Sequence, residues 1–152
     1  MLHKRLVTVL TFNDGVLFRT KLFQPDYRYT LNFVDAWSVD EIVVLDVTRP
    51  GHGERQSFFE VIQGFARKCF VPLAAGGGIR AMADVQHYLT LGADKVVVNT
   101  AAIERPAFIG EIARRYGSQC VVLSIDAKKK EGGCYEVWSH FASRPTGLSL
   151  ED

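Results

Sequence analysis

The chain has few cysteines, almost no excess of charge of either sign, and no long hydrophobic run. Its 152 residues include three cysteines and four histidines, none at metal-ligand spacing, so we expect reduced thiols and no metal site. A formal net charge of +1 gives no reason to expect nucleic acid or an acidic membrane surface as a partner. No apolar run approaches the roughly 18 residues of a membrane span, and the N-terminus lacks a signal-peptide core. The sequence therefore predicts a cytoplasmic protein.

Two similar apolar runs are the most informative feature that is present. Residues 39–46 read Val-Asp-Glu-Ile-Val-Val-Leu-Asp, and residues 93–99 read Ala-Asp-Lys-Val-Val-Val-Asn. Such runs, ending in a polar residue, are typical of strands buried on both faces of a parallel sheet. Their repetition predicts an α/β fold that is part of a (β/α)8 TIM-type barrel, because a complete barrel needs roughly 250 residues. Residues 1–152 would form a single domain, the N-terminal part of that barrel, with about five parallel strands.

Turn and cap signals divide the chain into strands and helices. Asp14 with Gly15 predicts a tight turn, Pro25 lies in a predicted loop over residues 24–28, and Ser57 with Glu60 forms a predicted capping box at a helix start. Predicted strands are residues 5–11, 16–20, 41–47, 70–74, 95–98, 120–125 and 135–140, the last after a turn at Gly132 and Gly133. Predicted helices are residues 30–39, 57–66, 82–91 and 106–117, and residues 146–152 would approach another helix.

Glycines and small polar residues follow two neighbouring strands. Gly76, Gly77 and Gly78 let the backbone bring its N–H groups against an anion, although a tight turn with positive φ explains them equally well. Asn99 and Thr100, at the end of the next strand, favour a phosphate cradle, because an amide and a hydroxyl would complete it. The cradle lacks the lysine of a P-loop, which argues against a nucleoside triphosphate.

Carboxylates occupy the same end of two other strands. Asp126 would act there as a general acid or base, and a salt-bridged or helix-capping aspartate is the structural alternative. For Asp46 we favour a structural carboxylate that accepts loop N–H bonds. Thr11 holds the corresponding place on the first strand, and a hydroxyl cannot perform the proton transfer of a carboxylate.

Charged residues mark the opposite, N-terminal ends of the strands. Arg5, Glu41 and Lys95 occupy three of these ends. Charges there usually form a solvated ring of ion pairs that contributes only stability. That interpretation holds unless something passes through the barrel.

Seven motifs together resemble one enzyme family. The chain resembles the N-terminal portion of the cyclase subunit of imidazole glycerol phosphate synthase, a (β/α)8 barrel of histidine biosynthesis. A sister family, the phosphoribosyl isomerases, shares the fold and the glycines but not the last of these motifs. The motifs are Met1-Leu-x-Lys-Arg5, Asp14-Gly15, Leu45-Asp46, Gly76-Gly-Gly-Ile79, Gly92-Ala-Asp-Lys95, Asn99-Thr-Ala-Ala102, and Gly117-Ser-Gln119 followed by Ile125-Asp-Ala-Lys128.

The resemblance implies a reaction, a partner and a set of site residues. In the family, a glutamine amidotransferase subunit releases ammonia, which passes through the barrel. The ammonia attacks a phosphoribulosyl nucleotide intermediate to give imidazole glycerol phosphate and an aminoimidazole carboxamide ribotide. The expected substrate is thus a phosphorylated small molecule, and no cofactor is expected. By resemblance, the catalytic positions are Asp126 and Thr11, the phosphate-binding residues are Gly77, Gly78, Asn99 and Thr100, and the ammonia gate is Arg5, Glu41 and Lys95.

Two departures from the family pattern leave alternatives open. Thr11 stands where the family has a catalytic aspartate, and the second phosphate site, the last three strands and a fourth gate residue would lie beyond Asp152. The altered first strand and the loop at residues 23–29 resemble a divergent branch that pairs with an amidotransferase to install amidino groups on bacterial surface sugars. The third alternative is a non-catalytic half-barrel. Under any of the three alternatives, a half-barrel would expose apolar residues and would therefore form homo-oligomers or bind a complementary half. The residues expected to be exposed are Val43, Leu45, Val97 and Ile125.

Overall fold

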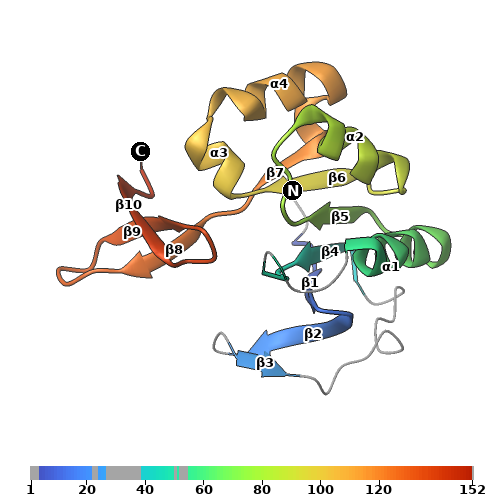
Figure 1. The fold of residues 1–152 in the computed structure, drawn as a ribbon, viewed down its shortest axis with the longest axis horizontal. Helices are drawn as coiled ribbons and strands as arrows, with labels where there is room; N and C mark the ends of the chain where they lie inside the picture. The colour runs from blue at the N-terminus through green and yellow to red at the C-terminus, as the bar shows by residue number, and fades with distance from the viewer. Residues whose placement is uncertain (1–3, 22–23, 27–38, 50, 52–54, 152) are drawn as a thin grey trace. The chain divides into compact units, whose positions relative to one another are not determined.

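The chain forms two compact units, Met1–Val97 and Val98–Asp152 (Figure 1). The structure is a computed structural model that describes residues 4–21, 24–26, 39–49, 51 and 55–151, with side chains described for residues 4–17 and from residue 39 onward within these ranges. No helix of the described residues is long and apolar enough to span a membrane.

A mostly parallel sheet forms the first unit. β1, β4, β5 and β6 are parallel, with Val9 opposite Val43 and Ala75 opposite Val96. β2 and β3 continue the sheet beyond β1 as antiparallel strands. This confirms the predicted class, an α/β fold with part of a (β/α)8 barrel. The strands are β1 (Val7–Asn13), β2 (Val16–Lys21), β3 (Gln24–Asp26), β4 (Glu41–Asp46), β5 (Leu73–Gly76) and β6 (Lys95–Val98), in the order β3-β2-β1-β4-β5-β6.

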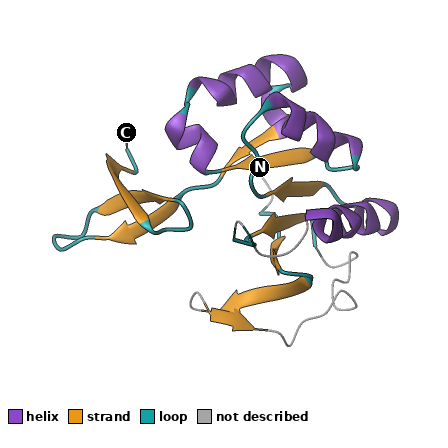
Figure 2. Cartoon of the chain, viewed as in Figure 1, coloured by secondary structure: helices purple, strands orange, loops and turns teal. Residues whose placement is uncertain are grey.

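Two helices, α1 (Arg55–Lys68) and α2 (Met82–Thr90), pack on this sheet (Figure 2). Phe58 of α1 is fully buried and lies 5.3 Å, ring centroid to centroid, from Phe12 of β1. Ile42 and Val44 of β4 are also fully buried. Each such side chain contributes about 1.5–3 kcal/mol of burial free energy, so this layer is the core of the unit.

The other face of the sheet is more open. Val7 and Val9 are exposed, and Val43 and Leu45 are half-buried. The expectation that Val97 would be exposed is wrong, because its side chain is buried. Val97 pairs with Gly76 on the adjacent strand, where a Cβ would lie only 2.7 Å from the Cβ of Val97, so the lack of a side chain at Gly76 makes room for the valine.

Several predicted boundaries in the first unit need correction. Residues 24–26 form β3 instead of a loop, since an edge strand tolerates Pro25. α1 covers Arg55–Lys68, so Ser57 lies inside the helix and not at its start. The strand predicted at residues 70–74 begins later, at Leu73. The helical hydrogen bonding continues to Cys69, whose N–H donates to Phe65 O at 2.8 Å. The chain therefore has to turn before β5, and Phe70 is exposed. Residues 30–38 of the helix predicted at residues 30–39 lie outside the described residues, and residue 39 is not helical.

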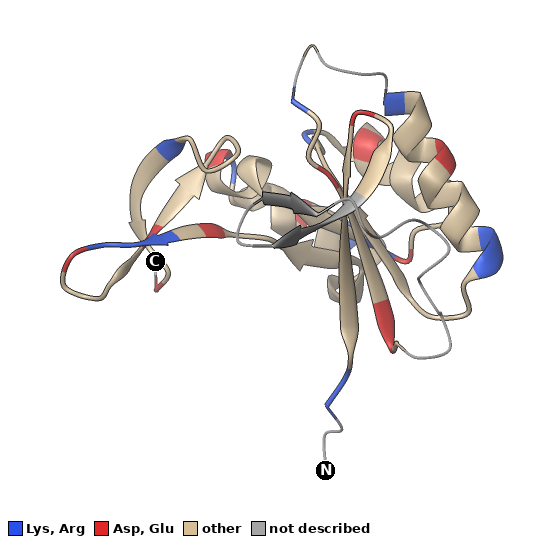
Figure 3. Ribbon diagram, turned by 90° about the horizontal axis from the view of Figure 1, so that it is seen from below, with Lys and Arg blue, Asp and Glu red and all other residues tan. Residues whose placement is uncertain are grey.

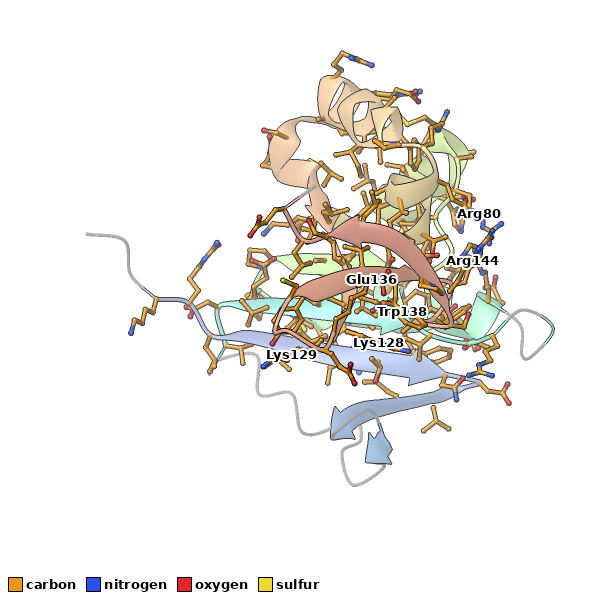
Figure 4. The ribbon with its side chains drawn as sticks, turned by 90° about the vertical axis from the view of Figure 1, so that its left-hand side faces the viewer. Arg80, Lys128, Lys129, Glu136, Trp138 and Arg144 are labelled. Atoms are coloured by element: carbon orange, nitrogen blue, oxygen red, sulfur yellow. The ribbon has the colours of Figure 1, made fainter. Side chains whose placement is uncertain are left out.

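The second unit joins helices to a separate antiparallel sheet. Phe108 and Ile112 of α4 are fully buried, and Ser124 N–H donates to Val98 O at 2.9 Å. In the sheet, Lys128 Nζ lies 3.6 Å from the ring centroid of Trp138 (Figure 4). The elements are α3 (Thr100–Glu104), α4 (Ala107–Tyr116), a 3-10 turn (Ser118–Cys120), β7 (Val121–Leu123), β8 (Asp126–Lys129), β9 (Tyr135–Ser139) and β10 (Arg144–Ser149), with β9 between β8 and β10.

The hairpin predicted around Gly132 and Gly133 is confirmed by β8 and β9. Other expectations for this unit are wrong. Residues 144–149 form β10, not the approach to a helix, because they pair with β9. α4 begins after Pro106, which precedes its first residue, and α3 was not predicted. Of the strand predicted at residues 120–125, only Val121–Leu123 form a strand, β7. Asp126 is the first residue of β8 and does not end the preceding strand.

Candidate functional site

Two aspartates attach strands of the first unit with the same pair of hydrogen bonds. Asp40 N–H donates to Leu6 O at 2.9 Å, and Asp40 Oδ2 accepts from Leu6 N–H at 2.6 Å. Asp94 does the same with Leu73, at 2.8 Å for both bonds. Asp40 immediately precedes β4 and Asp94 immediately precedes β6. The repeated sequence therefore places the next residue of each run, Glu41 and Lys95, at equivalent strand starts.

Glu41, Lys95 and Arg5 meet at this N-terminal end of the strands. Lys95 Nζ lies 2.6 Å from Glu41 Oε1, and Arg5 Nη1 lies 3.6 Å from Glu41 Oε2. The side chain of Glu41 is only 8% exposed, against 22% for Lys95 and 66% for Arg5. Figure 3 shows basic residues ahead of β1 and acidic residues at the start of the neighbouring strand. One buried carboxylate thus holds two cations together, so the three predicted gate residues form a real cluster.

A tightly packed glycine loop lies at the opposite end of the strands. Gly77 has φ +128° and Gly78 has φ +59°, conformations that L side chains rarely adopt. A Cβ at Gly77 would lie 2.6 Å from the Cβ of Asp46. Asp46 Oδ1 accepts the Thr48 N–H at 2.9 Å, which confirms the structural role predicted for that carboxylate. The loop backbone is therefore held close to the end of β4.

Two side chains of α2 bind the loop of residues 77–81, which joins β5 to α2, at its start and at its end. The Tyr88 hydroxyl donates to Gly77 O at 2.7 Å. Asp84 Oδ2 accepts N–H bonds from Arg80 at 2.8 Å and from Ala81 at 2.9 Å. The N–H groups nearest the helix are thereby satisfied within the protein. An incoming anion would meet the glycine part of the loop.

The second unit brings Asn99 and Asp126 together. Asn99 Nδ2 donates to Asp126 Oδ2 at 3.2 Å, so the amide orients the carboxylate. Asn99 Oδ1 is buried and has no hydrogen-bond partner among the residues that the structure describes. A buried acceptor without a donor is costly, and it would accept a hydrogen bond from an amine or from ammonia. A carboxylate and an amide oxygen side by side can receive a proton and hold the nitrogen that loses it.

Thr100 is linked to a histidine that the sequence did not single out. Thr100 Oγ1 accepts a hydrogen bond from the His140 backbone N–H at 3.5 Å. His140 Nε2 lies 3.4 Å from Glu104 Oε1. His140 gave no signal in the sequence because it is one of four scattered histidines. Tyr88 gave none either, since an aromatic residue in a helix normally belongs to the core.

The remaining predicted residue, Thr11, is nearly buried in β1, opposite Leu45 of β4 and Phe18 of β2. Thr11 and the glycine loop belong to the first unit, whereas Asn99, Thr100 and Asp126 belong to the second. The complete phosphate cradle and the pairing of Thr11 with Asp126 therefore stay predictions.

The sequence profile of the histidine biosynthesis protein family matches residues 7–152. The match runs from the first residue of β1 through all of the second unit.

Proposed function

Because this chain belongs to the histidine biosynthesis protein family, we propose that it is the N-terminal part of an ammonia-using barrel enzyme whose substrate is a phosphorylated sugar derivative. The reaction that we propose is that of the cyclase subunit of imidazole glycerol phosphate synthase. Ammonia attacks a phosphoribulosyl nucleotide intermediate, and imidazole glycerol phosphate and an aminoimidazole carboxamide ribotide are released.

The cluster of Arg5, Glu41 and Lys95 carries this proposal. It lies at the strand starts, the end opposite the glycine loop, and its carboxylate is almost completely buried. A phosphorylated substrate held at the glycine loop needs no charged group at the far end of the sheet. Ammonia that enters from a partner glutamine amidotransferase would pass this end first. Movement of the Lys95 ammonium away from the buried Glu41 carboxylate would open a path for a small neutral molecule such as ammonia.

The contact between Asn99 and Asp126 supports the chemistry. Asp126 would accept a proton from the attacking nitrogen, and Asn99 would hold the carboxylate in place through Nδ2. A positioned general base typically contributes about 10²–10⁴-fold in rate. With Thr11 in place of a second carboxylate, we expect residues 1–152 alone to turn over slowly, if at all.

Phosphate binding is the direct test of the proposed cradle. Millimolar inorganic phosphate should raise the melting temperature of the chain, because a ligand at ten times its Kd stabilises the folded state by about 1.4 kcal/mol. Asn99→Ala should abolish most of this shift. Tyr116→Phe serves as a control for general effects of a substitution in the same unit. An unchanged phosphate effect in Asn99→Ala would show that the cradle is misassigned.

A second candidate function follows from Thr11. Thr11 stands where the cyclase family has a catalytic aspartate. An enzyme of the divergent branch that amidinates surface sugars would still need an ammonia gate, but it would not need the acid–base pair of the cyclase. A full-length version that consumes the phosphoribulosyl intermediate with ammonium ions would support the cyclase. Ammonia-dependent amidination of a surface sugar without cyclase activity would support the alternative.

A further inference from the structure

The hydroxyl of Tyr88 makes a short hydrogen bond from the helix layer to the glycine loop. Tyr88 is 1% exposed, and its ring centroid lies 6.2 Å from that of Phe58 and 5.8 Å from that of Phe59. The hydroxyl donates to Gly77 O at 2.7 Å. Burial raises the pKa of Tyr88 well above its ordinary value, although the nearby Arg55 opposes the shift. The phenol therefore remains a protonated donor throughout the neutral range.

This bond fixes the orientation of one peptide group. Gly77 C=O and Gly78 N–H belong to the same planar trans peptide, in which the two groups point in opposite directions. With the oxygen held toward Tyr88, the Gly78 N–H must point away from the helix layer. Arg55 Nη1 also donates to Gly78 O, at 3.4 Å and in an exposed position, so its hold on the following peptide is weaker than that of Tyr88 on the Gly77–Gly78 peptide. Without such restraints, glycine peptides reorient easily.

We propose that Tyr88 is a positioning residue for anion binding: its hydroxyl turns the Gly77–Gly78 peptide so that the Gly78 N–H can donate to a phosphate oxygen. The inference rests on the proposed function, since it deepens the phosphate cradle assigned there. A preorganised donor saves the ligand the cost of ordering the loop. The buried ring of Tyr88 holds the hydroxyl in place, and the hydroxyl fixes the orientation of the Gly77–Gly78 peptide.

The test compares Tyr88→Phe with Tyr116→Phe. Both changes remove one buried hydroxyl and keep the ring, but the Tyr116 hydroxyl has no hydrogen-bond partner among the described residues. Inorganic phosphate is titrated into each labelled chain while the amide signal of Gly78 is followed by NMR. Tyr88→Phe should weaken phosphate binding about tenfold, the value of one lost hydrogen bond. Tyr116→Phe should bind as the unchanged chain does. Residual dipolar couplings without phosphate should change at Gly78 in Tyr88→Phe alone.

The outcomes separate the inference from the proposed function. Equal phosphate affinity in the unchanged chain and in Tyr88→Phe would overturn the positioning role and leave the cradle standing. A Gly78 coupling that does not change in Tyr88→Phe would overturn it as well. If phosphate does not shift the Gly78 signal of the unchanged chain, the cradle itself is refuted, and the role of Tyr88 in anion binding is refuted with it.

Discussion

Replacing Lys95 with methionine tests the cluster at the strand starts most directly. Lys95→Met keeps most of the aliphatic stem but removes the ammonium that lies 2.6 Å from Glu41 Oε1. The Glu41 side chain, only 8% exposed, would be left with Arg5 at 3.6 Å as its nearest cation among the described residues. Removing one partner of a buried pair costs about 3–5 kcal/mol. Because Lys95 is partly exposed and Arg5 remains, we expect about 3 kcal/mol.

The loss should be measured by urea unfolding followed by circular dichroism, with the slope compared between variants. In thermal unfolding, about 3 kcal/mol corresponds to a decrease of roughly 6–12 °C in the melting temperature of a domain this size. Arg5→Met is the matched control, since that side chain is 66% exposed and an exposed pair contributes about 1 kcal/mol or less. The double variant Glu41→Gln with Lys95→Met should recover most of the stability, because it removes the stranded charge.

Two results would contradict a buried, electrostatically coupled pair of Glu41 and Lys95. Lys95→Met could lower the free energy of unfolding no more than Arg5→Met does. That result would mean that water screens the pair of Lys95 and Glu41 as it screens an exposed pair. A double variant as unstable as Lys95→Met would mean that the loss comes from packing of the lysine stem and has no electrostatic origin.

Three further predictions follow from the same structure. Gly77→Ala should cost more than about 2 kcal/mol in urea unfolding, because its φ is +128° and the new Cβ would meet Asp46; Gly132→Ala, with φ +96° and open space around it, should cost about 1 kcal/mol, and equal costs would contradict the packing argument. Thr11→Asp in a full-length version should recover ammonia-dependent cyclase activity if the proposed reaction is correct, and failure in a folded variant would favour the sugar-amidinating branch. The chain should elute as an oligomer in gel filtration, because Val7 and Val9 expose an apolar sheet face; a compact monomer that binds no hydrophobic dye would contradict this.

Elements whose cause is local were predictable from the sequence. The turn at Asp14 and Gly15 has positive φ at both residues, 46° and 84°, and joins β1 to β2 with Asn13 opposite Val16. Asp-Gly is favoured in such two-residue hairpin turns because both positions require positive φ. β6 has the predicted bounds, Lys95–Val98. The repeated runs also placed Glu41 and Lys95 at equivalent strand starts, from which their meeting could be expected.

Contacts between distant segments were decided only by the tertiary structure. Residues 144–149 carry no strong strand pattern, and they become β10 because the edge of β9 is available to pair with them. The Tyr88 bond to Gly77 depends on how α2 packs back over the loop that precedes it, and no residue pattern announces it. The alternation of strands and helices follows from local sequence, because hydrophobic periodicity and turn chemistry act over a few residues. The tertiary structure decided which polar atoms meet, because hydrogen bonds depend on distances of a few tenths of an ångström between segments that the sequence does not relate.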